Sequence, residues 1–216
     1  MDWEQARFNM IEQQIRPWNV LEQGVLDAFI RVERENFVPP AWREMAFADM
    51  EIPLAPDTAM WHPKLEAKIL QAAQLQASDK VLDIGSGSGY FAALLAQQAK
   101  LVYSVEIRES LAQQARANLH AAGISNVMID NGDASLGWPK YAPYDVIIVG
   151  GSLPDIADGL CEQLNIGGRL LAVIGQSAPM HAVRIIRHTT GFSRQILFET
   201  ELAPLNNEKK PASFVF

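Results

Sequence analysis

The chain has 216 residues, 49% of them hydrophobic, which is enough for one sizeable core and short for two full domains. It carries 25 acidic and 18 basic residues, a formal net charge of −7, and has no dense lysine and arginine run. This balance argues against a protein that grips nucleic acid. No apolar run is long enough to span a bilayer. Cys161 is the single cysteine and cannot form an internal disulfide.

The start of the chain has neither the basic nor the apolar region of a secretory signal. The four histidines and Cys161 show no ligand spacing, so no metal site is predicted. We therefore expect a cytoplasmic protein made of one domain over residues 1–216, with a monomer favoured and no nucleic-acid or membrane partner.

The first 63 residues are expected to form helices followed by a loop on the substrate side. Apolar residues, beginning with Phe8 and Leu21, recur at helical spacing over 8–15 and 21–30, which indicates two amphipathic helices. Residues 37–63 show little periodicity and contain five prolines, so an irregular ordered segment is predicted there. Loops held against a scaffold often carry function.

Residues 64–216 are expected to form an α/β core. Strand and helix patterns alternate in this part, which predicts a doubly wound, mostly parallel sheet covered on both faces and ending in an antiparallel hairpin. The expected strands are 81–84, 101–107, 127–131, 144–149 and 169–174; the expected helices are 65–73, 91–98, 110–122 and one marked by Ile156, Leu160 and Leu164; the hairpin strands are 183–188 and 192–200.

The stretch 81–90, VLDIGSGSGY, reads as a strand, a tight turn and the start of a helix. Gly85, Gly87 and Gly89 lack the side chains that would keep a ligand off the backbone. The amides of the turn, which also contains Ser86, face outward at the positive end of the helix. The turn therefore predicts a nucleotide-like ligand.

The glycine spacing narrows the choice of ligand. The third glycine of the dinucleotide fingerprint Gly-x-Gly-x-x-Gly is missing from its place, and so is the lysine of a phosphate-binding P-loop. The remaining common interpretation is S-adenosylmethionine. A nicotinamide-dependent oxidoreductase is a less favoured alternative.

Acidic residues lie where the expected strands meet the ligand. Glu106 comes 17 residues after Gly89, at the offset where a carboxylate accepts both ribose hydroxyls, and Asp133 is placed to accept from an adenine amine. The alternatives are a solvated strand-end carboxylate and an ordinary Gly-Asp turn. Asp83 stands inside an apolar strand and needs a partner, either the turn amides or the ammonium group of the cofactor.

Two absences favour oxygen as the methylated atom. The fourth strand of the core is followed by Gly150 and Gly151, not by the Asp/Asn-Pro-Pro-aromatic sequence that methyltransferases acting on amine nitrogens often carry. Cys161 lies inside a predicted helix and does not resemble the nucleophile of cytosine C5 methylation; a small buried apolar role suits it better.

Eight segments along the chain carry a family resemblance: VERENFVP at 32–39, IPL at 52–54, VLDIGSGSGY at 81–90, SVE at 104–106, NGD at 131–133, APYD at 142–145, GGRL at 167–170 and APL at 203–205. Through them the chain resembles, over nearly its whole length, the protein-L-isoaspartate O-methyltransferases. The resemblance implies a class I methyltransferase sheet of the Rossmann-like type with an N-terminal helical extension. It also implies that the turn (Gly85, Ser86, Gly87 and Gly89), Asp83, Glu106 and Asp133 hold S-adenosylmethionine.

One segment departs from the family pattern. Where the family has Gly-Gln-Thr-Ile-Ser-Gln-Pro, this chain has Asp-Thr-Ala-Met-Trp-His-Pro over 57–63, so Trp61 takes the place of the serine and His62 that of the glutamine. In one interpretation Trp61 faces the sulfonium and His62 orients the acceptor or accepts its proton. In the other, Trp61 plugs a loop and His62 lies on the surface.

The expected function is transfer of a methyl group to a carboxylate of altered aspartyl residues in proteins or peptides. Two alternatives stay open from sequence. One is a divergent methyltransferase with another acceptor, including a small molecule, and the other is a cofactor-binding protein without transfer activity.

Overall fold

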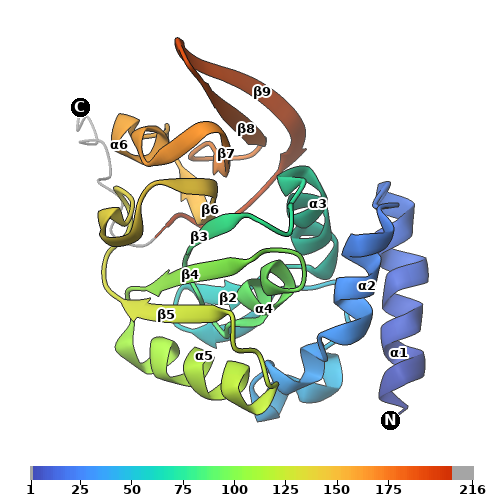
Figure 1. The fold of residues 1–216 in the computed structure, drawn as a ribbon. Coiled ribbons are helices and arrows are strands. Elements are labelled where there is room, and N and C mark those ends of the chain that lie inside the picture. Colours follow the sequence, from blue (N-terminus) through green and yellow to red (C-terminus); the bar gives the residue numbers. More distant parts are fainter. Residues whose placement is uncertain (1, 206–216) are drawn as a thin grey trace, which may run out of the picture.

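A seven-stranded β-sheet forms the centre of the computed structural model, which describes residues 2–205 (Figure 1). The strand order is β5-β4-β3-β6-β7-β8-β9. Pairs from β5 to β7 are parallel and the last two pairs are antiparallel, which confirms the predicted mostly parallel sheet with a C-terminal hairpin. The strands are β3 (Lys80–Ile84), β4 (Leu101–Glu106), β5 (Val127–Asn131), β6 (Tyr144–Leu153), β7 (Leu164–Ile174), β8 (Met180–His188) and β9 (Gly191–Thr200).

Alternating side chains give the sheet two buried faces. In β3, Val81 belongs to one hydrophobic core and Leu82 to the other, and β6 divides Val146 and Ile147 in the same way. The first core contains residues of α3 (Pro63–Ala73) and α4 (Tyr90–Ala96), and α5 (Glu109–Ala121) packs beside α4. The second core contains residues of α6 (Asp158–Glu162), and Tyr141 of the short 3-10 turn Pro139–Tyr141 packs against it.

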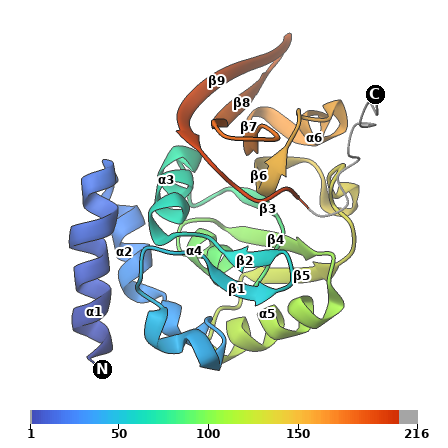
Figure 2. The ribbon, with the colours of Figure 1, turned by 180° about the vertical axis from the view of Figure 1, so that it is seen from behind.

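The N-terminal helices lie outside α3, with α2 between α1 and α3 in both views (Figures 1 and 2). Val25, Leu26 and Phe29 are buried, whereas Phe8, Leu21 and Ile30 are exposed, so the apolar stripes are narrower than the sequence suggested. These elements are α1 (Trp3–Met10), a π-helix (Ile11–Ile15), a 3-10 turn (Arg16–Trp18) and α2 (Gln23–Arg31). No helix within residues 2–205 is long and apolar enough to cross a membrane.

The segment expected to be irregular contains a short antiparallel hairpin, β1 (Ile52–Ala55) and β2 (Thr58–Met60). Its turn includes Asp57 with φ of 58°, and prolines at 53 and 56 hide the strand pattern in the sequence. Figure 2 shows the hairpin in front of the sheet. Two 3-10 segments, Arg34–Asn36 and Pro40–Met45, precede it.

Predicted boundaries around β6 and β7 are wrong: β6 was expected to end at residue 149 but runs to Leu153, and β7 was expected to begin at residue 169 but begins at Leu164. The helix expected to continue to Leu164 ends at Glu162, and Leu164 begins β7, where it pairs with Tyr144 of β6. The apolar residues at 160 and 164 fit helical spacing, but pairing in the sheet decides the conformation of Leu164. The expected division of the chain at residue 63 stays a prediction.

Gly89 and Gly123 make a matched pair for testing the packing beside the glycine-rich turn. Both have positive φ, but an added Cβ at Gly89 would lie 3.2 Å from the Cβ of Ala115 in α5, whereas Gly123 has open space. We expect Gly123→Ala to lower the free energy of unfolding by about 1 kcal/mol and Gly89→Ala by about 3 kcal/mol. Urea denaturation measures both, and equal losses would contradict the packing argument.

Candidate active site

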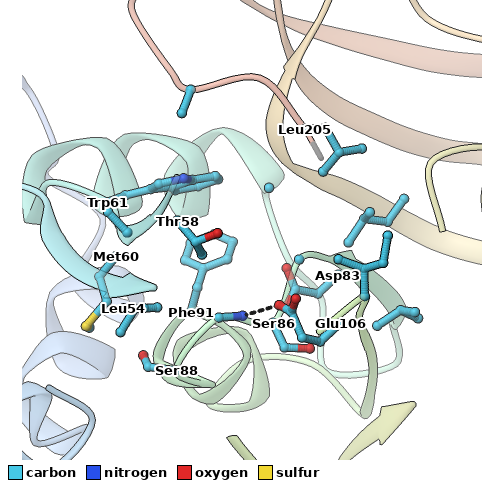
Figure 3. A pocket seen from close by; sticks show the side chains of 18 of the residues that line it. Leu54, Thr58, Met60, Trp61, Asp83, Ser86, Ser88, Phe91, Glu106 and Leu205 are labelled. Atoms are coloured by element: carbon cyan, nitrogen blue, oxygen red, sulfur yellow. Dashed lines mark hydrogen bonds between the residues drawn. The ribbon is translucent and has the colours of Figure 1, made fainter. Parts of the chain in front are cut away.

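A cavity with about 1030 Å³ of empty space, counting the part open to solvent, lies beyond the carboxyl ends of β3, β4, β5 and β6. Open α/β sheets bind ligands at this edge. One wall comes from the glycine-rich turn and the ends of β4 and β5 (Figure 3). The opposite wall comes from the β1–β2 hairpin and Trp61, and residues 202–205 cover part of the opening.

The glycine-rich turn brings bare backbone to the cavity. Gly85 and Gly87 line it with positive φ values of 98° and 52°. Gly150 of β6 lies against the end of β3. An added Cβ at Gly150 would lie 2.4 Å from the carbonyl oxygen of Ile84, so the two backbones can pack this closely only without a side chain there. Ser86 also lines the cavity. Gly89 is not among the lining residues; it faces Ala115 of α5.

Glu106 is fixed at the end of β4 by two backbone amides. Its Oε2 accepts from the Gly87 amide at 2.9 Å, the dashed line in Figure 3, and its Oε1 accepts from the Arg108 amide at 3.0 Å. The side chain of Asp133 lies on the same wall after β5, and its Oδ1 accepts from the Ser135 amide at 2.9 Å. Both predicted carboxylates therefore reach the cavity.

Asp83 is 1% exposed and is held by a chain of hydroxyls. Ser104 Oγ donates to Asp83 Oδ2 at 2.6 Å, and Ser86 Oγ lies 2.6 Å from Ser104 Oγ. The partner within the protein is thus a serine on β4 and not the turn amides; the ammonium group of the cofactor as a second partner stays a prediction. Burial raises the pKa of Asp83 to about 7, against the hydrogen bond from Ser104, and the nearby Glu106 charge adds to the rise.

Arg34 is fully buried and ties the hairpin wall to the rest of the fold. Its Nη1 donates to Glu66 Oε2 of α3, its Nη2 to the Trp61 carbonyl at 2.8 Å, and its Nε to the Ala46 carbonyl at 2.9 Å. Its guanidinium lies over the ring of Tyr90, 4.7 Å from the centroid. Burial raises the pKa of Glu66 to about 7, although Arg34 acts in the opposite direction.

Trp61 and His62, which take the places of the family's serine and glutamine, lie in different environments. Trp61 lines the cavity, and its ring lies 5.1 Å from that of Phe91, tilted by 47° (Figure 3). His62 is not a lining residue; its Nδ1 lies 3.3 Å from Asp49 Oδ1. The structure therefore brings Trp61, but not His62, to the cavity that the turn and the carboxylates share.

Several residues in or around the site were missed from sequence, among them Arg34, Glu66, Phe91 and Arg108. A signal existed for Glu66, which interrupts the apolar stripe of α3 between Leu65 and Ile69, where a buried acid requires a cation. The signal for Arg34 was its place in the VERENFVP segment. Nothing in the sequence pattern points to Arg108, whose Nη1 donates to the Pro56 carbonyl at 2.7 Å and Thr58 Oγ1 at 2.6 Å.

Known proteins are similar to this chain in sequence and in fold. The profile of the protein-L-isoaspartate (D-aspartate) O-methyltransferase family matches residues 5–210. The protein-L-isoaspartate O-methyltransferase of Gloeobacter violaceus is 36% identical over 93% of this chain and 98% of its own. That of Geobacter metallireducens is 38% identical over 88% of each chain. The chain belongs to the protein-L-isoaspartate O-methyltransferase family.

Solved structures agree with this membership. A protein-L-isoaspartate O-methyltransferase structure matches with a TM-score of 0.78 and 25% identity, covering 94% of this chain and 65% of the other. A Plasmodium falciparum structure described as a beta-aspartate methyltransferase in complex with S-adenosyl-L-homocysteine also has a TM-score of 0.78, at 17% identity, over 95% and 98% of the two chains. This likeness shows the shared fold. The family makes the present chain an S-adenosylmethionine-dependent methyltransferase.

The residues of the cavity fit this cofactor. Glu106 and Asp133 offer carboxylate oxygens to hydroxyl and amine donors, and Gly85, Gly87 and Gly150 leave the backbone open to close approach. The faces of Trp61 and Phe91 suit a sulfonium cation. Within residues 2–205, no group of three or more histidine, cysteine, aspartate or glutamate residues is arranged to hold a metal ion.

The raised pKa of Asp83 predicts a pH dependence of stability. Its pKa is about 7 in the folded state against an ordinary 3.8, so the folded chain binds this proton more tightly than the unfolded chain. This contribution to stability is complete below about pH 4 and is lost as the pH rises through about 7. Between about pH 4 and about pH 7 this carboxyl should change the free energy of unfolding by on the order of 1–3 kcal/mol, and we expect Asp83→Asn to remove that change.

Urea denaturation at several pH values measures this effect. The pKa of Glu66 is also raised to about 7, so Glu66 contributes to stability over the same pH range. The Asp83→Asn variant should therefore keep part of the dependence of unfolding free energy on pH. Asp155→Asn, at a side chain 79% exposed, should keep the wild-type profile. A variant profile for Asp83→Asn that matches the wild type would show that this carboxyl does not titrate as described.

Proposed function

We propose that this enzyme transfers the methyl group of S-adenosylmethionine to the free carboxylate of isoaspartyl residues in proteins or peptides, as a step in the repair of altered aspartyl residues in the cytoplasm. Family membership supports the chemistry. The observation that carries the proposal is one cavity with the glycine-rich turn and Glu106 on one wall and Trp61 on the other.

The cofactor-side wall would bind and orient the donor. Glu106, anchored by the Gly87 and Arg108 amides, would accept from the ribose hydroxyls, and Asp133 would accept from the adenine amine. Asp83 and the turn would hold the amino-acid end. When bound, S-adenosylmethionine supplies an activated methyl group and its own leaving group.

The acceptor-side wall needs only to position the substrate and exclude water. A carboxylate is already ionised at neutral pH, so in-line displacement requires no base. This suits the observed site, where His62 faces Asp49 and is not a lining residue. A role for His62 in orienting the acceptor stays a prediction.

Trp61 sets the size of the acceptor side. Its indole stands where the family has a serine, and the Arg34 bond to its carbonyl fixes the backbone. An indole occupies far more space than a hydroxymethyl group and offers one N–H donor. We therefore propose that Trp61 narrows the range of isoaspartyl substrates without abolishing transfer.

Methyl transfer to an isoaspartyl peptide tests the proposed function. The purified enzyme, incubated with S-adenosylmethionine labelled on the methyl group, should produce base-labile label on an isoaspartyl peptide and none on the matched aspartyl peptide. Absence of label on the isoaspartyl peptide, with cofactor binding shown by titration, would refute the proposed acceptor.

Replacing Trp61 by serine tests the steric role of the indole. For an isoaspartyl peptide with uncharged neighbours, we expect Trp61→Ser to raise kcat/KM by about tenfold, because a steric obstacle of 1–2 kcal/mol is removed. The exposed Trp42→Ser is the matched control and should leave kcat/KM unchanged. No gain in Trp61→Ser would count against the indole as the obstacle.

A further inference from the structure

The charged residues that line the cavity within 2–205 are all acidic. Among its residues within 2–205 there is no lysine, arginine or histidine. Three acids lie on the cofactor side and three on or near the hairpin wall. These six residues are Asp83, Glu106, Asp133, Glu51, Asp57 and Glu66.

The six acids differ in whether another side chain of the protein pairs with their carboxylate. Glu66 is paired with the buried Arg34, and Asp83 is held by Ser104. Glu51 and Asp57 take part in none of the ion pairs found within residues 2–205. Arg108 bonds to the hairpin at Pro56 and Thr58 but does not line the cavity. On the hairpin wall, Glu51 and Asp57 are therefore acids without an ion-pair partner within residues 2–205, and the cation at the turn beside Asp57 is the Arg108 guanidinium.

Glu51 and Trp61 both line the cavity, each one residue beyond the open end of the hairpin. Ile52 pairs with Met60 at the open end of the hairpin, and Glu51 and Trp61 are the next residue on each side of that pair. Both are partly exposed. A carboxylate next to an aromatic face is a suitable surface for a lysine or arginine side chain.

The acceptor alone does not balance this charge. An isoaspartyl carboxylate is itself negative and would be attracted by the sulfonium, but it adds to the negative charge opposite Glu51 and Asp57. A positive side chain on the same peptide would offset that repulsion. The chain as a whole, with a net charge of −7, also favours a positively charged partner.

We propose that the preferred acceptor carries a lysine or arginine next to its isoaspartyl residue, and that this cation lies against Trp61 and Glu51 at the mouth of the cavity. This inference rests on the proposed function and names the class of substrate within it. Trp61 and Glu51 would then be specificity-determining residues, acting on the neighbour of the methylated group.

Isoaspartyl peptides that differ only in the flanking residues test the inference. Lysine, norleucine or glutamate is placed on both sides of the isoaspartate, norleucine matching the length of lysine without its charge. We expect kcat/KM to be about threefold to tenfold higher with lysine than with norleucine, and lower still with glutamate. In 0.5 M NaCl these ratios should shrink, because salt screens exposed charges.

Glu51→Gln tests the placement of the cation. The ratio between lysine and glutamate peptides should fall at least by half in this variant. Glu4→Gln, an exposed acid on α1 with the same change of charge, should keep the wild-type ratio. Equal rates for the three peptides in the wild type would overturn the inference, and an unchanged ratio in Glu51→Gln would overturn the site assigned to the cation.

A binding measurement separates this inference from the proposed function. Calorimetric titration of the three peptides into the complex of the enzyme with S-adenosylhomocysteine should give the same order of affinity, lysine first. That order without methyl transfer to any peptide would support the cation site and refute the proposed acceptor. Transfer to all three peptides with equal affinities would support the acceptor and refute the cation site.

Discussion

The arrangement of the active site depends on the buried guanidinium of Arg34. It bonds at once to Glu66 of α3, to the carbonyl of Trp61 and to the carbonyl of Ala46, and it lies over Tyr90 of α4. A buried charge is costly unless each of its donors is satisfied. This requirement fixes the end of the β1–β2 hairpin relative to two core helices, so the hairpin wall of the cavity is part of the folded core.

The two walls of the cavity use carboxylates in different ways. Glu106 is held by backbone amides at 2.9 and 3.0 Å. Asp83 is buried behind it, hydrogen-bonded to Ser104, with a pKa raised to about 7. Both carboxylates are buried, at 5% exposure for Glu106 and 1% for Asp83, so their donors are what distinguishes them. Glu106 accepts from two backbone amides, whereas Asp83 accepts from a serine hydroxyl.

Much of the fold was predictable, and so was the wall of the cavity that the glycine-rich turn forms, because both follow from local patterns. The glycine-rich turn, Glu106 and Asp133 stand at strand ends that hydrophobic periodicity locates well. The hairpin at 52–60 was not predictable, because prolines at 53 and 56 interrupt a strand of only four residues. The Arg34 network joins residues up to 32 positions apart, and no periodicity reports such a pairing. Gly89 fits the pattern of a ligand-binding glycine, yet its missing side chain makes room for α5.

Arg108 links the two walls of the cavity and so restricts how substitutions can change either wall. Its main-chain amide donates to Glu106 on one wall of the cavity, while its guanidinium donates to the turn of the hairpin on the other wall. A change in the path of the backbone at this one position would displace both walls together. A substitution that moves Arg108 therefore alters the two walls at once, which limits how far either wall can diverge while the other is kept.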